Sequence, residues 1–504
     1  MQISIQKGDI LDEACDLLVV NFFQGIEKPG GATGAVDTAL QGDLSALLKQ
    51  DRFSGKLGEK LCFPTFGRLK AKKVCVLGLG KKADMTADTV RQIGGHIVKA
   101  ARDAKAKRVI TILHGAGMGG VDAELSAQML GEGLWLASYE FHDHFGAETK
   151  KKKSSFPSNI LMMESERKHI RPAEKGLERA RILAEATVYA RDLVNTSPRH
   201  MKPFNLMEAA KSVSALSKRI RCTVYDKERM ERMGMGAALA VAEGSVNPPQ
   251  CVHLVYIPKQ RSKKKIAVIG KGVTFDSGGL SLKPADGMTT MKIDMAGAAS
   301  VIGLFRALAE IDVPAEIHGV FIAVENMPSG GSYRPGDVVT AMNGMTIEIL
   351  NTDAEGRVTM ADSLSFAAKR IKPDEIIDLA TLTGAAVVAL GEDYTGIMSN
   401  NRTLVRSLLK ASEAAGENMW ELPLPELYEE ALKSKIADMN NTGGRTAGCI
   451  KGGLFLKRFV DGIPWAHLDI AGPSYCEKET RSDTPYGGTG VGVRTLMAYL
   501  KSLA

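Results

Sequence analysis

An alternating run from Thr346 to Leu350 is followed without a break by the acidic heptad Asn351 to Arg357. The alternation of β-branched and polar residues is typical of a strand. After the heptad, apolar side chains recur at Met360, Leu364 and Ala367, which is the spacing of one helix face. The heptad therefore predicts a strand-to-helix turn that carries two carboxylates, and such turns are the building units of α/β folds.

The two carboxylates of this turn require a counter-charge. Asp353 and Glu355 are two positions apart, and in extended backbone that spacing points both side chains the same way. Two like charges held together are costly unless a cation neutralises them. For the heptad taken alone, the alternative is a solvated acidic turn with Arg357 as its local partner.

A second group of charged residues follows the apolar run Ile266 to Ile269, which is typical of a buried strand. Glycines flank several of these residues and would let a ligand approach closely. Because α/β folds place their sites at the carboxyl edge of the sheet, we expect the charged residues of both groups to converge there. They are Lys271, Asp276, Lys283, Asp294, Asp353 and Glu355.

A pocket with four carboxylates and no histidine suits divalent ions such as Mn²⁺, Mg²⁺ or Zn²⁺. Two such ions, roughly 3.5–4 Å apart, can hold a shared hydroxide and polarise a carbonyl. Only one of the nine histidines, His467, lies in one of the matching sequence blocks named in the next paragraph. Its apolar flanks predict a buried structural residue. No G-x-S-x-G occurs, and Gly270-Lys271 lacks the spacing of a phosphate loop, which argues against a serine hydrolase or an NTPase.

These blocks resemble the signatures of the leucyl aminopeptidase (cytosol aminopeptidase) family, peptidase family M17, whose hallmark matches Asn351 to Arg357. Further matching blocks include Glu325 to Gly330, Thr381 to Gly384 and Trp465 to Gly472, so the resemblance is dense over about 190–500. It implies a dimetal aminopeptidase that uses a metal-bridging hydroxide. The substrates would be peptides with a free α-amine, preferably with N-terminal leucine or another apolar residue.

The resemblance also implies the metal ligands. Asp276 and Glu355 would bridge two divalent ions, Mn²⁺ or Zn²⁺. Lys271 and Asp294 would complete the tighter site, and Asp353 would complete the more exchangeable one. A lysine ligand must be neutral, which a nearby dication favours by lowering its pKa.

The same resemblance implies the remaining site residues. Lys283 would donate a hydrogen bond to the developing oxyanion, and Arg357 would hold a bicarbonate that shuttles a proton. The apolar pocket for the first side chain would be lined by Met291, Thr381, Leu382, Thr383 and Gly384.

Alternating strand and helix patterns predict two α/β domains. The smaller one, residues 1–165, is implied to resemble macro domains. The larger one, residues 166–504, is the catalytic domain and should contain a mixed, mostly parallel sheet covered by helices. Polar residues over 154–170 predict a linker, and the pattern from Pro172 predicts a connecting helix over about 172–194. The resemblance implies a homohexamer.

A glycine-rich turn in the N-terminal domain supplies the alternative function. Gly78 to Ala83 read G-x-G-x-x-A after an apolar run, which mimics a dinucleotide-binding turn, and His114 to Gly120 are also glycine-rich. The fingerprint needs an acidic residue at the end of the next strand, whereas Leu113 is followed by His114. The alternative is thus a nucleotide- or nucleic-acid-binding protein with a vestigial peptidase fold, and the intact site residues argue against it.

Composition narrows the remaining classes. The net charge of +7 over 504 residues is mild and the basic residues are dispersed, which disfavours a nucleic-acid partner. Seven scattered cysteines predict neither a disulfide framework nor a C-x-x-C metal site, and they suit a reducing compartment. The sequence opens on a strand-like run, Met1 to Ile5, with no signal peptide or membrane span, so we expect a cytoplasmic enzyme.

Overall fold

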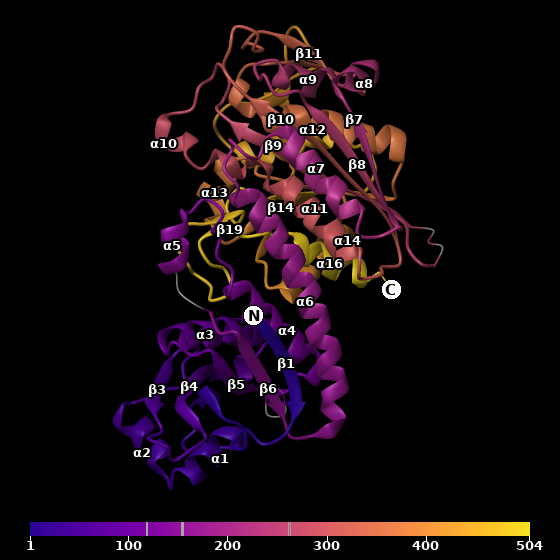
Figure 1. The fold of residues 1–504 in the computed structure, drawn as a ribbon. Coiled ribbons are helices and arrows are strands. Elements are labelled where there is room, and N and C mark those ends of the chain that lie inside the picture. Colours follow the sequence, from indigo (N-terminus) through magenta and orange to yellow (C-terminus); the bar gives the residue numbers. More distant parts are fainter. Residues whose placement is uncertain (117–118, 153–155, 261, 263, 504) are drawn as a thin grey trace. The chain divides into compact units, whose positions relative to one another are not determined.

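The computed structural model describes residues 1–116, 119–152, 156–260, 262 and 264–503, which form two compact α/β units (Figure 1). The N-terminal unit comprises Met1–Ala184 and Lys478–Pro485, and the C-terminal unit comprises Glu185–Glu477 and Tyr486–Ala504. The predicted two-part α/β fold is confirmed. The boundary between the two units, after Ala184, falls inside a long helix. The domain boundary expected after residue 165 stays a prediction. None of the described helices is both long and apolar enough to cross a bilayer.

The N-terminal unit is built on one six-stranded sheet with the order β1-β6-β5-β2-β4-β3. All neighbouring strands are parallel except β3, which pairs antiparallel with β4 at the edge. The strands are β1 Gln2–Lys7, β2 Cys15–Gln24, β3 Lys60–Pro64, β4 Ala71–Lys81, β5 Arg108–Ile112 and β6 Asn159–Glu164.

Helices cover both faces of this sheet because its strands are apolar on both sides. Leu17 and Val19 of β2 belong to the core formed with α3 and α4. Leu18 and Val20, which point the other way, belong to the core formed with α1 and α2. The helices are α1 Gly31–Ala39, α2 Asp43–Gln50, α3 Ala87–Asp103, α4 Ala123–Ala137, α5 Ala147–Lys152 and the long α6 Arg167–Asn195.

The predicted linker over 154–170 is wrong where the structure describes it. Residues 159–164 form β6, an inner strand whose side chains from Ile160 to Met163 are buried between β1 and β5. The connecting helix is confirmed but longer than predicted. It begins at Arg167, so Pro172 lies inside α6 instead of starting it and removes one internal backbone donor.

The C-terminal unit contains an eight-stranded mixed sheet with the order β15-β14-β17-β13-β9-β10-β8-β7. The central run β17-β13-β9-β10 is parallel, as predicted, and antiparallel pairs join β14 to β17, β10 to β8 and β8 to β7. The strands of this sheet are β7 Ile220–Tyr225, β8 Gln250–Tyr256, β9 Lys265–Asp276, β10 Glu316–Asn326, β13 Glu375–Ala380, β14 Thr395–Ser399, β15 Met419–Glu421 and β17 Trp465–Asp469.

Smaller strands and helices complete the C-terminal unit. Its short sheets contain β11 Val338–Thr340, β12 Thr346–Glu348 and β16 Met439–Asn440, and β18 Tyr475–Cys476 and β19 Gly487–Gly488. Its helices are α7 Pro203–Ser214, α8 Lys227–Arg232, α9 Gly236–Ala242, α10 Ala285–Met288, α11 Ala296–Leu308, α12 Glu355–Phe366, α13 Gly384–Leu390, α14 Arg402–Ala415, α15 Gly448–Lys457 and α16 Val493–Lys501.

The central strand β9 is buried on both faces. Ala267 and Ile269 belong to the core that includes residues of α9, α12 and α15. Gly270, on the opposite face, lies directly against Gly297 and Ala298 of α11. Two covered faces explain why Ile266 to Ile269 form a continuous apolar run instead of an alternating one.

A segment near the C-terminus belongs to the N-terminal unit. Arg481 forms an ion pair with Asp88 of α3 at 2.7 Å, and the Gln92 amide donates to Asp483 at 2.8 Å. The Ser482 hydroxyl also donates to the backbone oxygen of Gln92 at 2.6 Å. These polar contacts join segments almost four hundred positions apart, so no local pattern could predict them.

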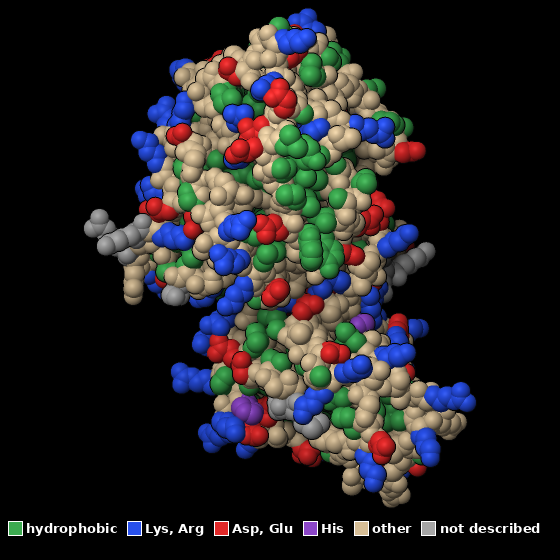
Figure 2. Space-filling model, turned by 180° about the vertical axis from the view of Figure 1, so that it is seen from behind, with side chains coloured by type: hydrophobic (Ala, Val, Ile, Leu, Met, Phe, Trp, Pro, Cys, Tyr) green, Lys and Arg blue, Asp and Glu red, His purple; other side chains and the backbone are tan. Residues whose placement is uncertain are grey.

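Charged side chains of both signs are interspersed over the face shown in Figure 2, while hydrophobic side chains gather in a band on the C-terminal unit. The mixture agrees with the dispersed basic residues of the sequence. A contiguous apolar band on a protein surface is a frequent mark of an interaction site.

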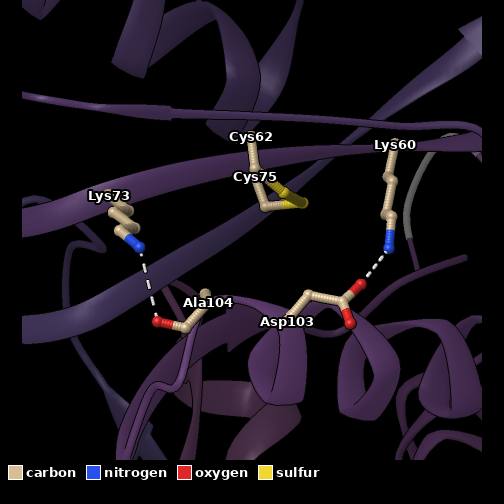
Figure 3. Close-up of a disulfide and its surroundings, with 6 residues drawn as sticks. All are labelled: Lys60, Cys62, Lys73, Cys75, Asp103 and Ala104. Carbon is tan, nitrogen blue, oxygen red and sulfur yellow. Dashed lines mark hydrogen bonds and ion pairs between the residues drawn. A yellow bond between two sulfur atoms is a disulfide. The ribbon is translucent and has the colours of Figure 1, made fainter.

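Strands β3 and β4 are cross-linked by a disulfide between Cys62 and Cys75, which lie opposite each other in the antiparallel register (Figure 3). This pair was not expected from the scattered cysteines. The other five cysteines form no disulfide bond among the described residues. In the same region Lys60 pairs with Asp103, and Lys73 donates to the backbone oxygen of Ala104 at 3.4 Å.

The glycine motif that suggested a nucleotide site is part of a strand. Gly78 to Lys81 belong to β4, and only Lys82 to Asp84 leave it, as a short 3₁₀ turn before α3. The prediction of a strand-to-helix glycine turn is therefore wrong here. Gly78 is a glycine because a Cβ there would lie 2.0 Å from the backbone oxygen of Lys56. The described part of the second glycine-rich stretch excludes residues 117–118.

Gly78→Ala should destabilise the N-terminal unit by about 1–3 kcal/mol, because the added methyl meets rigid backbone and the strand must shift. Gly146→Ala is the control, since a Cβ there meets nothing within 4 Å. Urea denaturation, monitored by hydrogen exchange in peptides from each unit, measures the stability of both variants. Equal stability of the two variants would contradict this account of Gly78.

Candidate functional site

The C-terminal unit contains a cavity of about 440 Å³ at the carboxyl ends of β9, β13 and β17. Every site residue expected from the sequence lines this one cavity. These residues are Lys271, Asp276, Lys283, Met291, Asp294, Asp353, Glu355, Arg357, Thr381, Leu382, Thr383 and Gly384.

Two of the charged residues lie within β9 instead of following it. The strand extends to Asp276, and Lys271 pairs in register with Ile322 of β10. Both side chains are buried, with exposures of 3% and 1%. The sequence underestimated this strand because a lysine and glycines interrupt its apolar pattern, whereas here the strand carries its charges into the site.

The heptad is not extended, so the expected geometry of its two carboxylates is wrong. Residues 352–354 form a 3₁₀ turn, and α12 begins at Glu355. The side-chain oxygen of Asn351 accepts from the backbone N–H of Asp353 at 2.9 Å and caps this turn. The carboxylates nevertheless converge: ligand atoms of Asp276, Asp353 and Glu355 all lie within 4.8 Å of one another.

Two lysines lie among these carboxylates. Lys271 Nζ is 2.6 Å from Asp294 Oδ1 and 2.9 Å from Glu355 Oε1. Lys283 Nζ is 2.8 Å from Asp276 Oδ2 and 2.5 Å from Asp353 Oδ1. The ammonium groups therefore supply positive charge to a cluster that would otherwise repel itself.

Burial and crowding shift the titration of the cluster. Burial, and then the charge of Asp276, raise the pKa of Glu355 to about 8, and burial raises that of Asp294 to about 6. Burial lowers the pKa of Lys271, but the surrounding carboxylates, Asp294 first, outweigh it and hold the pKa above its ordinary value. A strong positive charge bound beside these two carboxyl groups would therefore stabilise their ionised forms.

The donor set fits divalent cations. Among the residues described, Asp294 Oδ2 and Glu355 Oε2 are buried with no hydrogen-bond partner. A buried carboxylate oxygen without a partner is costly, and a metal ion would satisfy it. The carboxylates are hard oxygen ligands of the kind that Mn²⁺, Mg²⁺ and Zn²⁺ accept, and the amine nitrogen of Lys271 adds a borderline ligand.

Asn326 orients Asp276 from behind. Its amide nitrogen donates to Asp276 Oδ1 at 2.8 Å and to the backbone oxygen of Thr352 at 2.9 Å. Tyr333 donates to the same Thr352 oxygen at 2.8 Å. The sequence alone assigns no role to Asn326 or Tyr333, because no local pattern indicates that they support the carboxylate cluster.

Gly356 is required by the close approach of Lys271. A Cβ on Gly356 would lie 2.5 Å from Lys271 Cε and 2.6 Å from its Nζ. The glycine of the heptad thus leaves room for the lysine side chain that reaches Glu355 from β9.

Arg357 is buried beside the cluster, so the alternative of a solvated acidic turn is wrong. Its exposure is 7%, and within the described chain its Nε and Nη1 have no hydrogen-bond partner. Burial lowers its pKa, against the opposing charges of Glu355 and Asp469. A buried guanidinium with free donors is suited to an anion.

The rest of the cavity wall is largely apolar. Met291, Ile293, Leu382, Val387 and Ala471 line it. Tyr475 and the exposed Glu392 and Glu477 also line the cavity, and sequence reasoning missed them because they fall on loops and short elements.

The prediction for His467 is confirmed. It is fully buried, and its Nδ1 lies 2.5 Å from Asp378 Oδ1, which raises the pKa of the imidazole despite burial. Trp465 donates to the other oxygen of Asp378 at 2.6 Å. His467 is not among the residues that line the cavity.

Comparison with protein families gives two matches. A model described as the catalytic domain of the cytosol aminopeptidase family matches residues 188–497, and one described as the N-terminal domain of that family matches residues 19–144. The chain is 41% identical over 502 residues to a probable cytosol aminopeptidase of Geobacter sulfurreducens, covering 100% of this chain and 99% of the relative. A probable cytosol aminopeptidase of Alkaliphilus oremlandii is 39% identical over 503 residues, with 100% of each chain covered.

Solved structures give the same result. A mutant of tomato leucine aminopeptidase superposes with a TM-score of 0.88 at 35% identity, covering 100% of this chain and 96% of that chain. The bottromycin maturation enzyme BotP in complex with Mn superposes with a TM-score of 0.85 at 34% identity, covering 97% and 100%. A manganese complex thus occurs in a protein of closely similar fold.

Asn326→Leu should weaken Mn²⁺ binding about 10–100-fold, because outer partners of a metal ligand hold its orientation. Isothermal titration with Mn²⁺ measures the affinity. Asn401→Ala, which removes the side-chain cap of α14, is the control: it should lower stability and leave Mn²⁺ affinity unchanged. Unchanged affinity in Asn326→Leu would show that Asp276 needs no such support.

Proposed function

Because the chain belongs to the cytosol aminopeptidase family, whose members are hydrolases that act on peptides, we propose that it uses two metal ions to remove apolar residues, leucine above all, from free peptide N-termini. The observation that carries this proposal is the convergence of Asp276, Asp353 and Glu355 within 4.8 Å beside two lysines, in a cavity with an apolar wall.

Five residues would hold the two ions. Asp276 and Glu355, whose ligand atoms converge with that of Asp353, would contact both. Lys271 and Asp294, which touch each other at 2.6 Å, would complete one site, and Asp353 would complete the other. When bound, the ions, Mn²⁺ or Zn²⁺, supply Lewis acidity toward the scissile carbonyl and lower the pKa of water.

Lys271 must change its charge to serve as a ligand. Its neighbouring carboxylates favour the ammonium form, as the raised pKa indicates. A dication in the cluster would neutralise those carboxylates and repel the ammonium, so Lys271 would release a proton on metal binding.

Lys283 has a different position that suits a role toward substrate. Its side chain is 16% exposed, against 3% for Lys271, and it contacts Asp276 and Asp353. There its ammonium would donate a hydrogen bond to the carbonyl oxygen as negative charge develops.

Arg357 would hold a bicarbonate. Its unpartnered Nε and Nη1 are the donors such an anion needs, and charge-assisted hydrogen bonds to a planar oxyanion are strong. When bound, bicarbonate supplies a proton acceptor close to the cluster.

The first side chain of the substrate would enter the apolar part of the cavity. Met291, Leu382 and the neighbouring Thr381, Thr383 and Gly384 line it. Their apolar surface favours leucine and similar residues, because burial of a side chain of that size contributes roughly 1.5–3 kcal/mol.

We further propose a cytoplasmic homohexamer. The hydrophobic band of the C-terminal unit in Figure 2 supports association, and the relatives are named for the cytosol. In the C-terminal unit, the large apolar side chains that are more than half exposed include Phe204, Leu216, Val246, Val388, Trp420, Leu427 and Ile436. The alternative of a nucleotide-binding protein loses its main support, since the G-x-G-x-x-A glycines lie within β4.

Hydrolysis of leucyl-p-nitroanilide in the presence of Mn²⁺ tests the function. We expect turnover that chelation abolishes and that Mn²⁺ or Zn²⁺ restores, because the proposed reaction depends on the Lewis acidity of the bound ions. Acetyl-leucyl-p-nitroanilide, which lacks the free amine, is the matched substrate and should not be cleaved. Equal cleavage of both substrates, or full turnover by metal-free protein, would refute the proposal.

Two variants separate the proposed roles of Lys283 and Glu355. Lys283→Ala should lower kcat about 10²–10³-fold while both ions stay bound, because it removes an oxyanion donor but no ligand. Glu355→Ala should lose metal, since its carboxylate would serve both ions. Elemental analysis beside kcat decides this assignment. A metal-free Lys283→Ala, or a Glu355→Ala that keeps both ions and full rate, would show that the residue roles are wrong.

A further inference from the structure

Asp469 is a buried carboxylate behind the apolar wall of the cavity. It ends β17, its exposure is 0%, and it lies in register with Ala380 of β13 on one side and Gly396 of β14 on the other. Burying a carboxylate is costly, so the fold retains it only where several donors meet it.

Three donors converge on this carboxylate from two cavity-lining segments. The Thr383 hydroxyl donates to Oδ2 at 2.7 Å, and the Leu382 N–H donates to Oδ1 at 3.2 Å. The Ala471 N–H also donates to Oδ1, at 3.2 Å. Leu382, Thr383 and Ala471 all line the cavity, so one side chain ties together the walls that follow β13 and β17.

Thr383 extends this connection to α13. Its hydroxyl oxygen accepts from the Ala386 N–H at 3.1 Å and caps the helix on which Val387, another lining residue, lies. Two positions earlier, Thr381 donates to Asp294 Oδ1 at 2.7 Å, and its backbone oxygen accepts from Lys271 at 3.1 Å. The apolar wall and the charged cluster therefore share one short segment, which Asp469 holds from behind.

We propose that Asp469 is a positioning residue that sets the width of the pocket for the first side chain, and thereby the preference for leucine over alanine. This inference rests on the proposed function, since it takes the wall formed by Leu382, Thr383 and Ala471 as that pocket. Asp469 itself does not line the cavity and acts only through the residues it holds.

The ratio of kcat/KM for leucyl- over alanyl-p-nitroanilide measures this role. Asp469→Ala should lower the ratio about tenfold, because a loosened wall loses its fit to the larger side chain. A purely structural defect lowers activity toward both substrates equally and leaves the ratio unchanged. In Asp469→Asn the amide oxygen can still accept two N–H groups and the amide nitrogen can donate to Thr383, so the ratio should be kept.

A second pair of variants tests the same connection in case Asp469→Ala does not fold. Thr383→Val keeps the side-chain shape but removes the hydroxyl, so the leucyl-to-alanyl ratio of kcat/KM should fall. Thr383→Ser keeps the hydroxyl, so this ratio should stay the same. Asp362→Ala is the matched control. Asp362 is likewise buried and accepts from two backbone N–H groups, of Ala238 and Met342, at 2.8 and 2.7 Å, but it does not line the cavity. That variant should lower the unfolding temperature and leave the ratio unchanged.

The outcomes distinguish the two proposals. If the unaltered protein shows no preference for leucine, the proposed substrate pocket is wrong. If it prefers leucine and the ratio stays the same in Asp469→Ala and Thr383→Val, the role of Asp469 is refuted. A fall in Asp469→Asn equal to that in Asp469→Ala would also refute it, because the connecting hydrogen bonds are kept in the asparagine variant.

Discussion

The contact of Lys271 with Asp294 and Glu355 is the interaction on which the C-terminal unit depends. Three ionisable side chains, each no more than 5% exposed, meet here in the interior. Charges removed from water cost several kcal/mol each unless well-placed partners compensate them. The middle of β9, the turn before α11 and the start of α12 must therefore come together accurately, and Gly356 leaves the space this approach requires.

The surrounding structure supports this contact from outside. Asn326 of β10 donates to both Asp276 and the backbone oxygen of Thr352 in the heptad, while Thr381 joins Asp294 to the segment after β13. The N-terminal unit uses buried charge differently. There Arg91 of α3 pairs with Glu132 of α4 at 2.9 Å, which joins two helices. The buried pair of the N-terminal unit thus joins two helices, whereas the buried charges of the C-terminal unit line a cavity at the ends of its strands.

The errors of sequence reasoning have definite physical causes. The polar pattern over 154–170 predicts a linker because the apolar-rich residues 159–164 between polar neighbours are too few to show a period. The glycines of β4 imitated a turn because local sequence does not reveal that a neighbouring backbone requires their small size. The heptad was expected to be extended, yet the cap from Asn351 and the start of α12 bend it.

The sequence by itself determined the α/β class and the charged residues of the candidate site, because hydrophobic period and residue chemistry are local properties. All of those residues line one cavity. Only the tertiary structure decided that Asp469 meets Thr383, that Asn326 holds Asp276, that residues 478–485 join the N-terminal unit and that Cys62 faces Cys75. Strand order and register bring such residues together, and no local pattern records which distant segments become neighbours.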